Sequence, residues 1–396
     1  MHEADILILG AGIVGLTLAR ELIEKGAQNI IIAEKESGLG FHASGRNSGV
    51  LHAGIYYTPG TLKAQCCLKG NLLLQAYCEE KNLPLAKTGK VIVARTADEL
   101  PMLHELFRRA TENGARVELL DESQLTDIEP LAKTYQQALY SHNTAVVDCK
   151  AILQSLLEDL LNSKKVTFLF NAEMTNVKSD TIIDTTKGPI RFKQFINATG
   201  AYADKVAQLF DVGKEYYLIP FKGIYEKLTP DKAHLVRGNI YPVPNPKNPF
   251  LGVHFTKNIH GDVYVGPTAI PAFGRENYGL LQGIDKEMFS IVKHQILLFF
   301  TNPEFRQVAL EEPKKYSSAY FYNDAKKLVK ELQPSWLIKT RKVGIRPQLI
   351  DSRNKKLIMD FLVLPEKNTL HILNATSPAF TSSMAFAKYI VESYLS

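Results

Sequence analysis

Residues 5–34 read DILILGAGIVGLTLARELIEKGAQNIIIAE and contain two short apolar runs with a glycine-rich turn between them. The runs at 5–9 and 29–33 have the length and composition of buried strands. Between them, residues 14–25 repeat apolar side chains at helical spacing, and Gly26 is a typical helix end. Strand, glycine turn, helix and strand within this distance predict a βαβ unit with a parallel sheet.

The turn between the first strand and the helix, GAGIVG, fits the pattern GxGxxG. In that pattern Gly10 permits a tight turn, Gly12 lets the backbone approach a pyrophosphate, and Gly15 allows close packing of helix on strand. Free N–H groups at the start of the helix add partial positive charge. Glu34 ends the second strand, about 20 residues after the last glycine, where a carboxylate accepts hydrogen bonds from ribose hydroxyls and repels a 2′-phosphate. The pattern therefore predicts a dinucleotide site that disfavours NADP.

The segment after the second strand distinguishes FAD from NAD. Residues 41–49 (FHASGRNSG) are rich in Gly, Ser, His and Asn and lack a helical period. A nicotinamide dehydrogenase usually continues into another helix and strand at this point, whereas flavoproteins use such a segment to wrap the pyrophosphate. We therefore expect FAD as the cofactor.

The remaining chain alternates between two textures. Short apolar runs at 166–200 are expected to rejoin the first sheet, and residues 216–270 alternate apolar and polar positions as an antiparallel sheet does. Helical patterns occur at 98–118, 281–300, 320–333 and 383–394. The expected fold is α/β: a Rossmann-type FAD-binding domain interleaved with an α+β substrate domain built on an antiparallel sheet. The expected division is 1–85, 145–215 and 336–396 for the FAD-binding domain, and 86–144 and 216–335 for the substrate domain.

Composition excludes several classes of protein. The chain has 396 residues, with 45% hydrophobic and 22% charged residues, which is typical of a globular protein with a sizeable core. The formal net charge of +6 is spread along the chain without a basic stripe, so we expect no nucleic-acid partner. Cys66, Cys67, Cys78 and Cys149 form no CxxC pair, which predicts free thiols and no metal site.

The apolar run at 296–300 is too short to cross a bilayer. We expect a cytoplasmic protein, with peripheral contact to the inner face of a membrane as the alternative.

Six stretches carry a resemblance to one known family. They are HASGRNSGVLHAGIYYTPGTLKA (42–64), IPFKG (219–223), GNIYPVPNPKNPFLGVHFT (238–256), GPTAIPAF (266–273), GIRPQ (344–348) and NATSPAFTSSMA (374–385). Together they resemble the L-2-hydroxyglutarate dehydrogenase/oxidase family of D-amino-acid-oxidase-like FAD enzymes, nearly from end to end. The resemblance implies oxidation of L-2-hydroxyglutarate to 2-oxoglutarate by hydride transfer to flavin N5.

Such a reaction needs a group to hold the carboxylate and a base to accept the hydroxyl proton. Arg346, in a G-[LIV]-R-P motif, is the expected carboxylate anchor, because a guanidinium grips a carboxylate bidentately. The base is expected to be a histidine, either His254 or His52. A second carboxylate requires a second cation, and Lys222 is the first choice by resemblance. The other candidates for substrate contact or flavin attachment are Lys63, Arg46, Arg275, Tyr56, Tyr57 and, for a covalent bond to FAD, His42.

The expected cofactor contacts follow the dinucleotide pattern, the segment after it and three later turns. The backbone N–H groups of the last turn are expected to face the flavin. These residues are Gly10, Gly12, Ile13, Val14, Gly15, Glu34, Lys35, Ser44, Gly45, Arg46, Asn47, Ser48, Thr199, Gly200, Gly344, Ile345, Arg346, Pro378, Thr381 and Ser382.

The electron acceptor and the substrate class leave alternatives. Related oxidases often place a lysine near the flavin on the strand after the substrate strand, but residues 262–266 read DVYVG. We therefore expect transfer to a quinone or another carrier rather than rapid reaction with O2. An FAD-dependent amino-acid or amine oxidase of the same fold, which needs no second carboxylate site, is the alternative function. A flavin-bearing RNA-binding protein is a third reading, against which the scattered charge argues.

Overall fold

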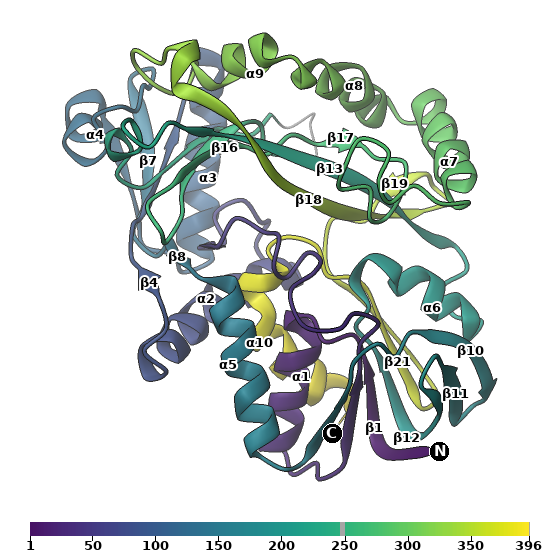
Figure 1. Cartoon of the computed structure of the whole chain (residues 1–396). Helices are drawn as coiled ribbons and strands as arrows, with labels where there is room; N and C mark the ends of the chain where they lie inside the picture. The colour runs from purple at the N-terminus through teal and green to yellow at the C-terminus, as the bar shows by residue number, and fades with distance from the viewer. Residues whose placement is uncertain (246–249, 396) are drawn as a thin grey trace.

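The computed structural model describes residues 1–245 and 250–395. Two large sheets lie one above the other, with helices along one side of the lower sheet and above the upper one (Figure 1). Residues 246–249, within the 238–256 stretch, are outside the described part of the chain.

The first sheet is built around the N-terminal strand β1 (His2–Leu9). Its neighbours β2 (Ile30–Ala33) and β12 (Gly188–Asn197) are parallel to it, as the βαβ pattern predicts. Parallel strands β9 and β21 extend the sheet on either side, and antiparallel strands lie at its edges. The further strands are β9 (Val166–Leu169), β10 (Met174–Ser179), β11 (Ile182–Thr185), β20 (Leu362–Glu366) and β21 (Thr369–Asn374).

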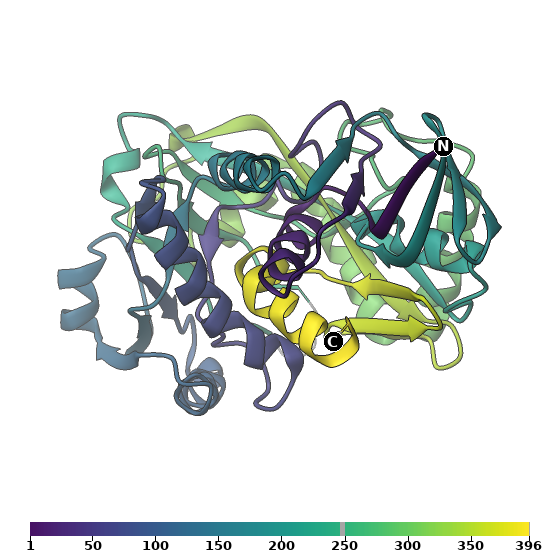
Figure 2. The ribbon, with the colours of Figure 1, turned by 90° about the horizontal axis from the view of Figure 1, so that it is seen from below.

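The apolar runs that predicted these strands are buried on both faces. Ile8 and Ile32 pack against the helices, whereas Leu7 and Ile31 pack against the β10–β11–β12 side. Successive side chains of a strand point to opposite faces, so an uninterrupted apolar run suits a sheet that is covered twice. Figure 2 shows the helices gathered on one side of the sheet. They are α1 (Ile13–Glu24), α2 (Leu62–Glu80), α5 (Cys149–Asn162) and α10 (Ala379–Ile390).

The second sheet is mainly antiparallel, as predicted for residues 216–270, and a pair of long strands, β13 and β18, runs along it. Its strands are β5 (Lys90–Val93), β6 (Val117–Asp121), β7 (Gln137–Ser141), β13 (Tyr216–Leu228), β14 (Asn239–Pro242), β15 (His254–Lys257), β16 (Val263–Gly266), β17 (Ile270–Pro271), β18 (Leu337–Asp351) and β19 (Lys356–Leu357). The helices around it are α3 (Leu100–Glu112), α4 (Glu122–Ile128), α7 (Met288–Thr301), α8 (Pro303–Glu311) and α9 (Ser318–Ala325). The helix α6 (Ala203–Leu209) follows β12 and packs between β21 of the first sheet and β13 and β18 of the second. A small third sheet joins β3 (Val50–Leu51), β4 (Leu85–Ala86) and β8 (Ala145–Val147).

The mixed α/β architecture is as predicted, but one boundary of the expected division does not coincide with the sheets. Residues 337–357 fall in the expected FAD-binding segment 336–396, whereas β18 and β19 belong to the second sheet. The reason is the long pairing of β18 with β13, which runs from Leu337 to Asp351. Only β20, β21 and α10 return to the first sheet and its helices. The four cysteines are free and buried.

Candidate functional site

A cleft of about 1350 Å³ lies between the glycine turn of the first sheet and the strands of the second. Its lining includes the glycine turn at 10–14, the loop at 41–48, the turn at 198–200, β18 at 344–348 and the turn at 375–381. Segments far apart in the sequence therefore meet around one cavity. Its size and its position at the carboxyl ends of β1 and β2 suit a dinucleotide with a substrate beside it.

The dinucleotide end of the cleft is fixed by hydrogen bonds to the glycine turn. The Glu34 carboxylate accepts the backbone N–H of Ala11 at 2.9 Å and that of Glu36 at 3.0 Å. The Ser44 hydroxyl accepts the backbone N–H of Ile13 at 3.0 Å. Gly12 precedes α1 without a side-chain cap, so the helix start opens on the cleft. A carboxylate and a helix start thus face the cleft in the arrangement typical of a dinucleotide site.

Two glycines of the turn are required by close approach. Gly10 has φ +106°, and a Cβ there would lie 2.6 Å from the Ala198 carbonyl oxygen. A Cβ on Gly15 would lie 2.0 Å from the Gly10 carbonyl oxygen. Gly15 therefore brings α1 against the turn rather than lining the cleft.

Most of the predicted cofactor residues line the cleft, and three do not. Gly15 lies behind the turn, Gly45 packs on the carbonyl of Gly40, and Ser382 lies within α10. Those that line it are Gly10, Gly12, Ile13, Val14, Glu34, Lys35, Ser44, Arg46, Asn47, Ser48, Thr199, Gly200, Gly344, Ile345, Arg346, Pro378 and Thr381.

A charged cluster borders the dinucleotide end. Within the described residues, Glu36, His42 and Glu276 are close enough to one another to hold a metal ion. The Lys35 ammonium, however, pairs with both carboxylates, at 2.5 Å from Glu36 and 2.6 Å from Glu276. Both ring nitrogens of His42 also have partners, namely Glu36 and the Tyr278 hydroxyl. A lysine thus already supplies the cation of this cluster.

His254 begins β15 and is buried, with 6% of its surface exposed. Its Nδ1 lies 2.8 Å from the Gly252 carbonyl oxygen, which can only accept, so Nδ1 carries the proton and Nε2 is the unprotonated nitrogen of the neutral ring. The imidazole stacks on Tyr241 with ring centroids 3.8 Å apart. Burial, with the charges of Lys90 and Arg346, lowers the pKa of His254 to about 3. At neutral pH it is a proton acceptor.

His52 also lines the cleft. Its backbone is held by Thr381, which accepts its N–H, and by Asn71, which donates to its carbonyl oxygen. Burial lowers its pKa to about 3, together with the charges of Lys90, His254 and Arg346. Its buried Nδ1 has no hydrogen-bond partner among the described residues.

Two cations share this end of the cleft. Arg346, on β18, is half-buried; its guanidinium has no hydrogen bond or ion pair to a described residue and lies over the Phe250 ring at 5.1 Å. Lys63, on α2, makes a single weak hydrogen bond to the Thr376 hydroxyl at 3.4 Å. Burial and the charge of Arg346 lower the pKa of Lys63 to about 8, against the opposite influence of Asp360. Neither the Arg346 guanidinium nor the Lys63 ammonium forms an ion pair with a carboxylate of the described residues.

The structure does not bring Lys222 to the cleft. Phe221 is opposite Arg346 in the β13–β18 register, so Lys222 points to the other face of the strand. Its ammonium donates to the Gly279 carbonyl oxygen at 2.7 Å. The hypothesis that Lys222 holds the second carboxylate is therefore corrected, and Lys63 occupies the place that it required.

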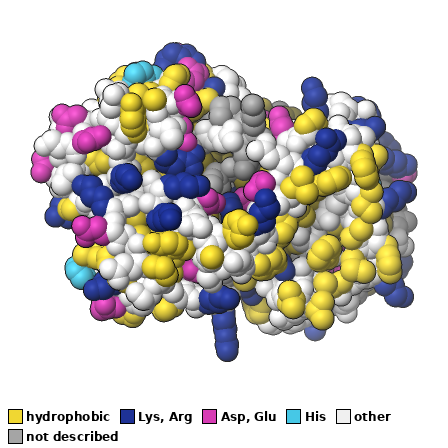
Figure 3. Space-filling view, turned by 90° about the horizontal axis from the view of Figure 1, so that it is seen from above, with side chains coloured by type: hydrophobic (Ala, Val, Ile, Leu, Met, Phe, Trp, Pro, Cys, Tyr) yellow, Lys and Arg dark blue, Asp and Glu magenta, His cyan; other side chains and the backbone are white. Residues whose placement is uncertain are grey.

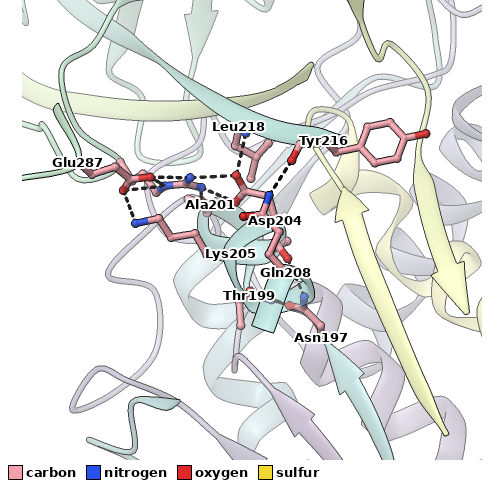
Figure 4. A network of polar contacts seen from close by, with 11 residues as sticks. Asn197, Thr199, Ala201, Asp204, Lys205, Gln208, Tyr216, Leu218 and Glu287 are labelled. Atoms are coloured by element: carbon pink, nitrogen blue, oxygen red, sulfur yellow. Dashed lines mark hydrogen bonds and ion pairs between the residues drawn. The ribbon is translucent and has the colours of Figure 1, made fainter. Parts of the chain in front are cut away.

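Arg275 lines the cleft, but its charge is already neutralised. Its guanidinium donates to Asp204 at 2.6 and 2.9 Å and to Glu287 at 2.8 Å, and Lys205 also reaches Glu287 (Figure 4). This network ties α6 to the loop before α7. Since two carboxylates already pair with the Arg275 guanidinium, this residue serves as a structural contact and not as a binding site for an anionic substrate.

The remaining candidates occupy the walls. Arg46 stacks on Tyr278 at 4.0 Å, and the Tyr57 hydroxyl bonds to Ser377. Tyr56 lines the cleft with its hydroxyl buried. Tyr225 and Tyr241 also line the cleft. The sequence analysis does not predict this, since an aromatic residue in a strand more often belongs to the hydrophobic core. The NIYPVP motif, which places Tyr241, was the signal available.

A flavin-sized cleft with a glycine turn, a ribose-binding glutamate and a neutral histidine beside an arginine defines an FAD-dependent oxidoreductase. The chain belongs to the family described as FAD dependent oxidoreductase (DAO), which matches residues 5–393. It is 36% identical to the mitochondrial L-2-hydroxyglutarate dehydrogenase of Caenorhabditis briggsae, over 98% of this chain and 93% of that one. It is 36% identical to the L-2-hydroxyglutarate dehydrogenase of Indibacter alkaliphilus, over 98% of both, and 33% identical to the mitochondrial human one, over 98% of this chain and 88% of that one.

Solved structures show the same fold at lower identity. L-alpha-glycerophosphate oxidase from Mycoplasma pneumoniae, solved with FAD bound, superimposes with a TM-score of 0.77 at 22% identity, over 99% of this chain and 94% of that one. Glycine oxidase from Geobacillus kaustophilus gives 0.73 at 18% identity, with the same coverage. The predicted cofactor and fold class are confirmed.

Proposed function

We propose that this chain oxidises L-2-hydroxyglutarate to 2-oxoglutarate. One observation carries the substrate: the half-buried Arg346 and the buried Lys63 are two cations that face the same cleft, and neither is paired with a carboxylate of the described residues. A buried cation without a partner is costly. A dicarboxylate substrate would neutralise both, and the relatives named above are dehydrogenases of such a substrate.

Arg346 is the proposed anchor for the carboxylate next to the reacting carbon, because its planar fork fixes orientation as well as position. Lys63 is proposed to hold the distal carboxylate as a point charge. FAD would be held by the glycine turn, Glu34 and Ser44, and would supply the two-electron acceptor. The protein's part is to orient the substrate and to move its proton.

His254 is the proposed base. Its Nδ1–H donates to the Gly252 carbonyl, which leaves Nε2 to accept the hydroxyl proton. Its lowered pKa keeps it neutral throughout the physiological range. His52 is the second candidate, since it is also neutral, but no described residue fixes its tautomer.

The alternative, oxidation of an amino acid or amine, is less compatible with this cleft. An ammonium substrate would approach Arg346 and Lys63 together, and like charges at short range are repelled. A 2-hydroxy acid carries no such charge.

Anaerobic reduction of the flavin tests the proposal. The yellow holoenzyme is mixed with L-2-hydroxyglutarate, its D-enantiomer, L-2-hydroxybutyrate and L-glutamate. We expect prompt bleaching with L-2-hydroxyglutarate alone. Faster bleaching with L-glutamate would favour the amino-acid oxidase, and no bleaching with any 2-hydroxy acid would refute the proposal.

A membrane quinone is the electron acceptor that we propose. β16 carries no lysine, and Lys342, which lies over the Tyr264 ring at 4.1 Å, is not among the residues that line the cleft. A lysine on this strand would stabilise developing superoxide, and β16 supplies none, while Arg346 and Lys63 are the cations proposed to hold the carboxylates of the substrate. Reduced enzyme mixed with air and with a soluble quinone should be reoxidised faster by the quinone. Faster reoxidation by air would make it an oxidase.

An exposed apolar face supports contact with a membrane. Hydrophobic and basic side chains gather on the half of the upper face that α7 and α8 occupy (Figure 3). Phe289 and Phe300 are 73% and 71% exposed, and Ile296 lies between them on the same helix face. The preceding loop exposes Leu280 and Leu281 by 78% and 77%. None of the helices in the described residues has the length and apolarity to span a bilayer. Such a face suits shallow insertion at an anionic surface.

Co-sedimentation with vesicles tests this contact. The wild type should sediment with vesicles that contain anionic phosphatidylglycerol, and the double variant Phe289→Ser/Phe300→Ser should remain in solution with unchanged bleaching by substrate. Leu72→Ser, which removes an exposed apolar side chain from α2 beside the first sheet, is the control and should sediment as the wild type does. Equal sedimentation of the double variant and the wild type would refute the contact.

A further inference from the structure

Lys90 is buried behind the site, although the reaction described above does not use it. It begins β5, and 1% of its surface is exposed. Its ammonium nitrogen is buried and has no hydrogen-bond partner among the described residues. It does not line the cleft. A buried, unpaired lysine is costly, and an apolar side chain of similar length would fill the space without that cost.

Aromatic rings take the place of a counter-ion. The ammonium lies 4.7 Å from the centroid of the Tyr56 ring and 4.8 Å from that of the Tyr241 ring. The negative faces of aromatic rings attract a cation at such distances. Tyr56 and Tyr241 both line the cleft, so Lys90 joins two of its walls from behind.

Tyr241 connects Lys90 to His254. The two rings stack with centroids 3.8 Å apart and 29° between their planes. One aromatic ring therefore separates the ammonium from the imidazole. At that distance and in a buried setting, a positive charge disfavours a second one on the imidazole.

The positive charge of Lys90 increases as the pH falls, which is the change that opposes protonation of His254. Burial lowers its pKa to about 7, against a smaller opposite influence of Cys67. As the pH falls below this value the ammonium form grows, and an ordinary histidine would begin to take up a proton in the same range. The other ionisable groups that face this cluster are His52, Cys67 and Arg346.

We propose that Lys90 is a positioning residue: it holds Tyr56 and Tyr241 in the cleft wall, where Tyr241 stacks on His254, and its positive charge adds to burial in disfavouring protonation of the His254 imidazole. The role in turnover rests on His254 as the base in the proposed function. The effect on the ionisation of His254 does not, and it is measurable without substrate.

The test compares Lys90→Met, which removes the charge at similar length, with Lys90→Arg, which keeps it. Lys222→Met is the matched control, because Lys222 is also a buried lysine of the second sheet but lies outside the cleft. Histidine is labelled with 13C at Cε1, the His254 signal is assigned by its absence in His254→Gln, and the holoenzyme is titrated toward acid pH by NMR.

We expect protonation of His254 to begin about one pH unit higher in Lys90→Met than in the wild type, for a lost charge at this range. The acid fall of kcat/KM should move by the same amount, with a much smaller change in kcat/KM at alkaline pH. Lys90→Arg and Lys222→Met should titrate as the wild type does.

An unchanged His254 titration in Lys90→Met, or an equal change in Lys222→Met, would overturn the proposal. If Lys90→Met fails to fold, Lys90→Arg decides, since His254 must then protonate no earlier than in the wild type. A shifted titration in an enzyme that ignores L-2-hydroxyglutarate would uphold the role of Lys90 and refute the proposed substrate.

Discussion

Arg346 has no partner among the described residues, so its replacement reports on substrate binding rather than on a broken protein contact. Arg346→Lys keeps the charge and loses the planar fork. We expect kcat/KM for L-2-hydroxyglutarate to fall by about 2–4 kcal/mol of transition-state stabilisation. Flavin content should stay normal. Near-native turnover of this variant would remove Arg346 from the substrate site.

Lys63 distinguishes a dicarboxylate from a monocarboxylate. Lys63→Met should raise KM for L-2-hydroxyglutarate about 10–100-fold, the value of a charge-assisted hydrogen bond, and leave the weak activity on L-2-hydroxybutyrate nearly unchanged. Lys69→Met, on the exposed side of the same helix, is the control. A parallel loss with both substrates would contradict a role at the distal carboxylate.

The pH dependence gives a second test of Lys63. Its pKa is lowered to about 8, and only the ammonium form attracts a carboxylate. In the wild type, kcat/KM for the dicarboxylate should therefore fall as the pH rises through about 8, because kcat/KM follows the ionisation of the free enzyme. Lys63→Met should show no such fall on the alkaline side.

At the scale of residues, the sequence motifs predicted the chemistry of the site better than they predicted which side chains lie in the cleft. The GxGxxG pattern and Glu34 located the dinucleotide end, and the G-[LIV]-R-P motif placed Arg346 in the cleft. Lys222 was misplaced because one step along a strand reverses the face, and register becomes known only from the paired strand. Lys63 was not ranked first because most lysines are exposed and a helix pattern does not show which face lines a cavity.

At the scale of elements, α2 and α10 cross closely at Gly70. A Cβ there would lie 2.4 Å from the Thr381 carbonyl oxygen and 2.7 Å from Ser382 Cα. The same turn of α10 holds His52 through Thr381. The glycine is therefore a packing requirement next to the site.

In Gly70→Ala, two effects of different size on the free energy of unfolding act in opposite directions. Helix propensity alone would stabilise the variant by about 1 kcal/mol, whereas overpacking costs about 1–3 kcal/mol. We expect a net loss of stability in urea unfolding, with weaker flavin binding. Leu72→Ala, at an exposed position of α2, should change stability by less than about 0.5 kcal/mol. A stabilised Gly70→Ala would contradict the close crossing.

Two helices differ from what the sequence pattern predicts. The helix predicted for 98–118 stops at Glu112, since Asn113 caps it and Gly114 turns with φ +81° before β6 begins. α2 was not predicted because it is buried on several sides, with Cys66, Asn71, Leu74 and Gln75 all inside, and so lacks one apolar stripe.

At the scale of the whole molecule, buried neutral histidines link stability to pH. Burial lowers the pKa of His52 and His254 to about 3 and that of His371 to about 4, from 6.5. Below 6.5 the unfolded chain therefore binds more protons than the folded one, and stability is lost as the pH falls.

The melting temperature of the holoenzyme should accordingly fall by several °C per pH unit as the pH drops below 6.5. His371→Gln, away from the cleft, should reduce the slope. A melting temperature that stays level down to about pH 5 would show that these imidazoles are not buried in neutral form.

The order of strands in the first sheet has a consequence for synthesis. β1 leaves the ribosome early, yet its neighbour β12 ends at Asn197, and the next strand, β21, ends at Asn374. The apolar faces of β1 and β2 must therefore wait, partly uncovered, while most of the polypeptide is still being translated. Contacts of such long sequence separation slow folding and favour aggregation of the nascent chain. We expect this protein to depend on chaperones during translation far more than its compact native state would indicate, and a fragment made from either end alone to precipitate.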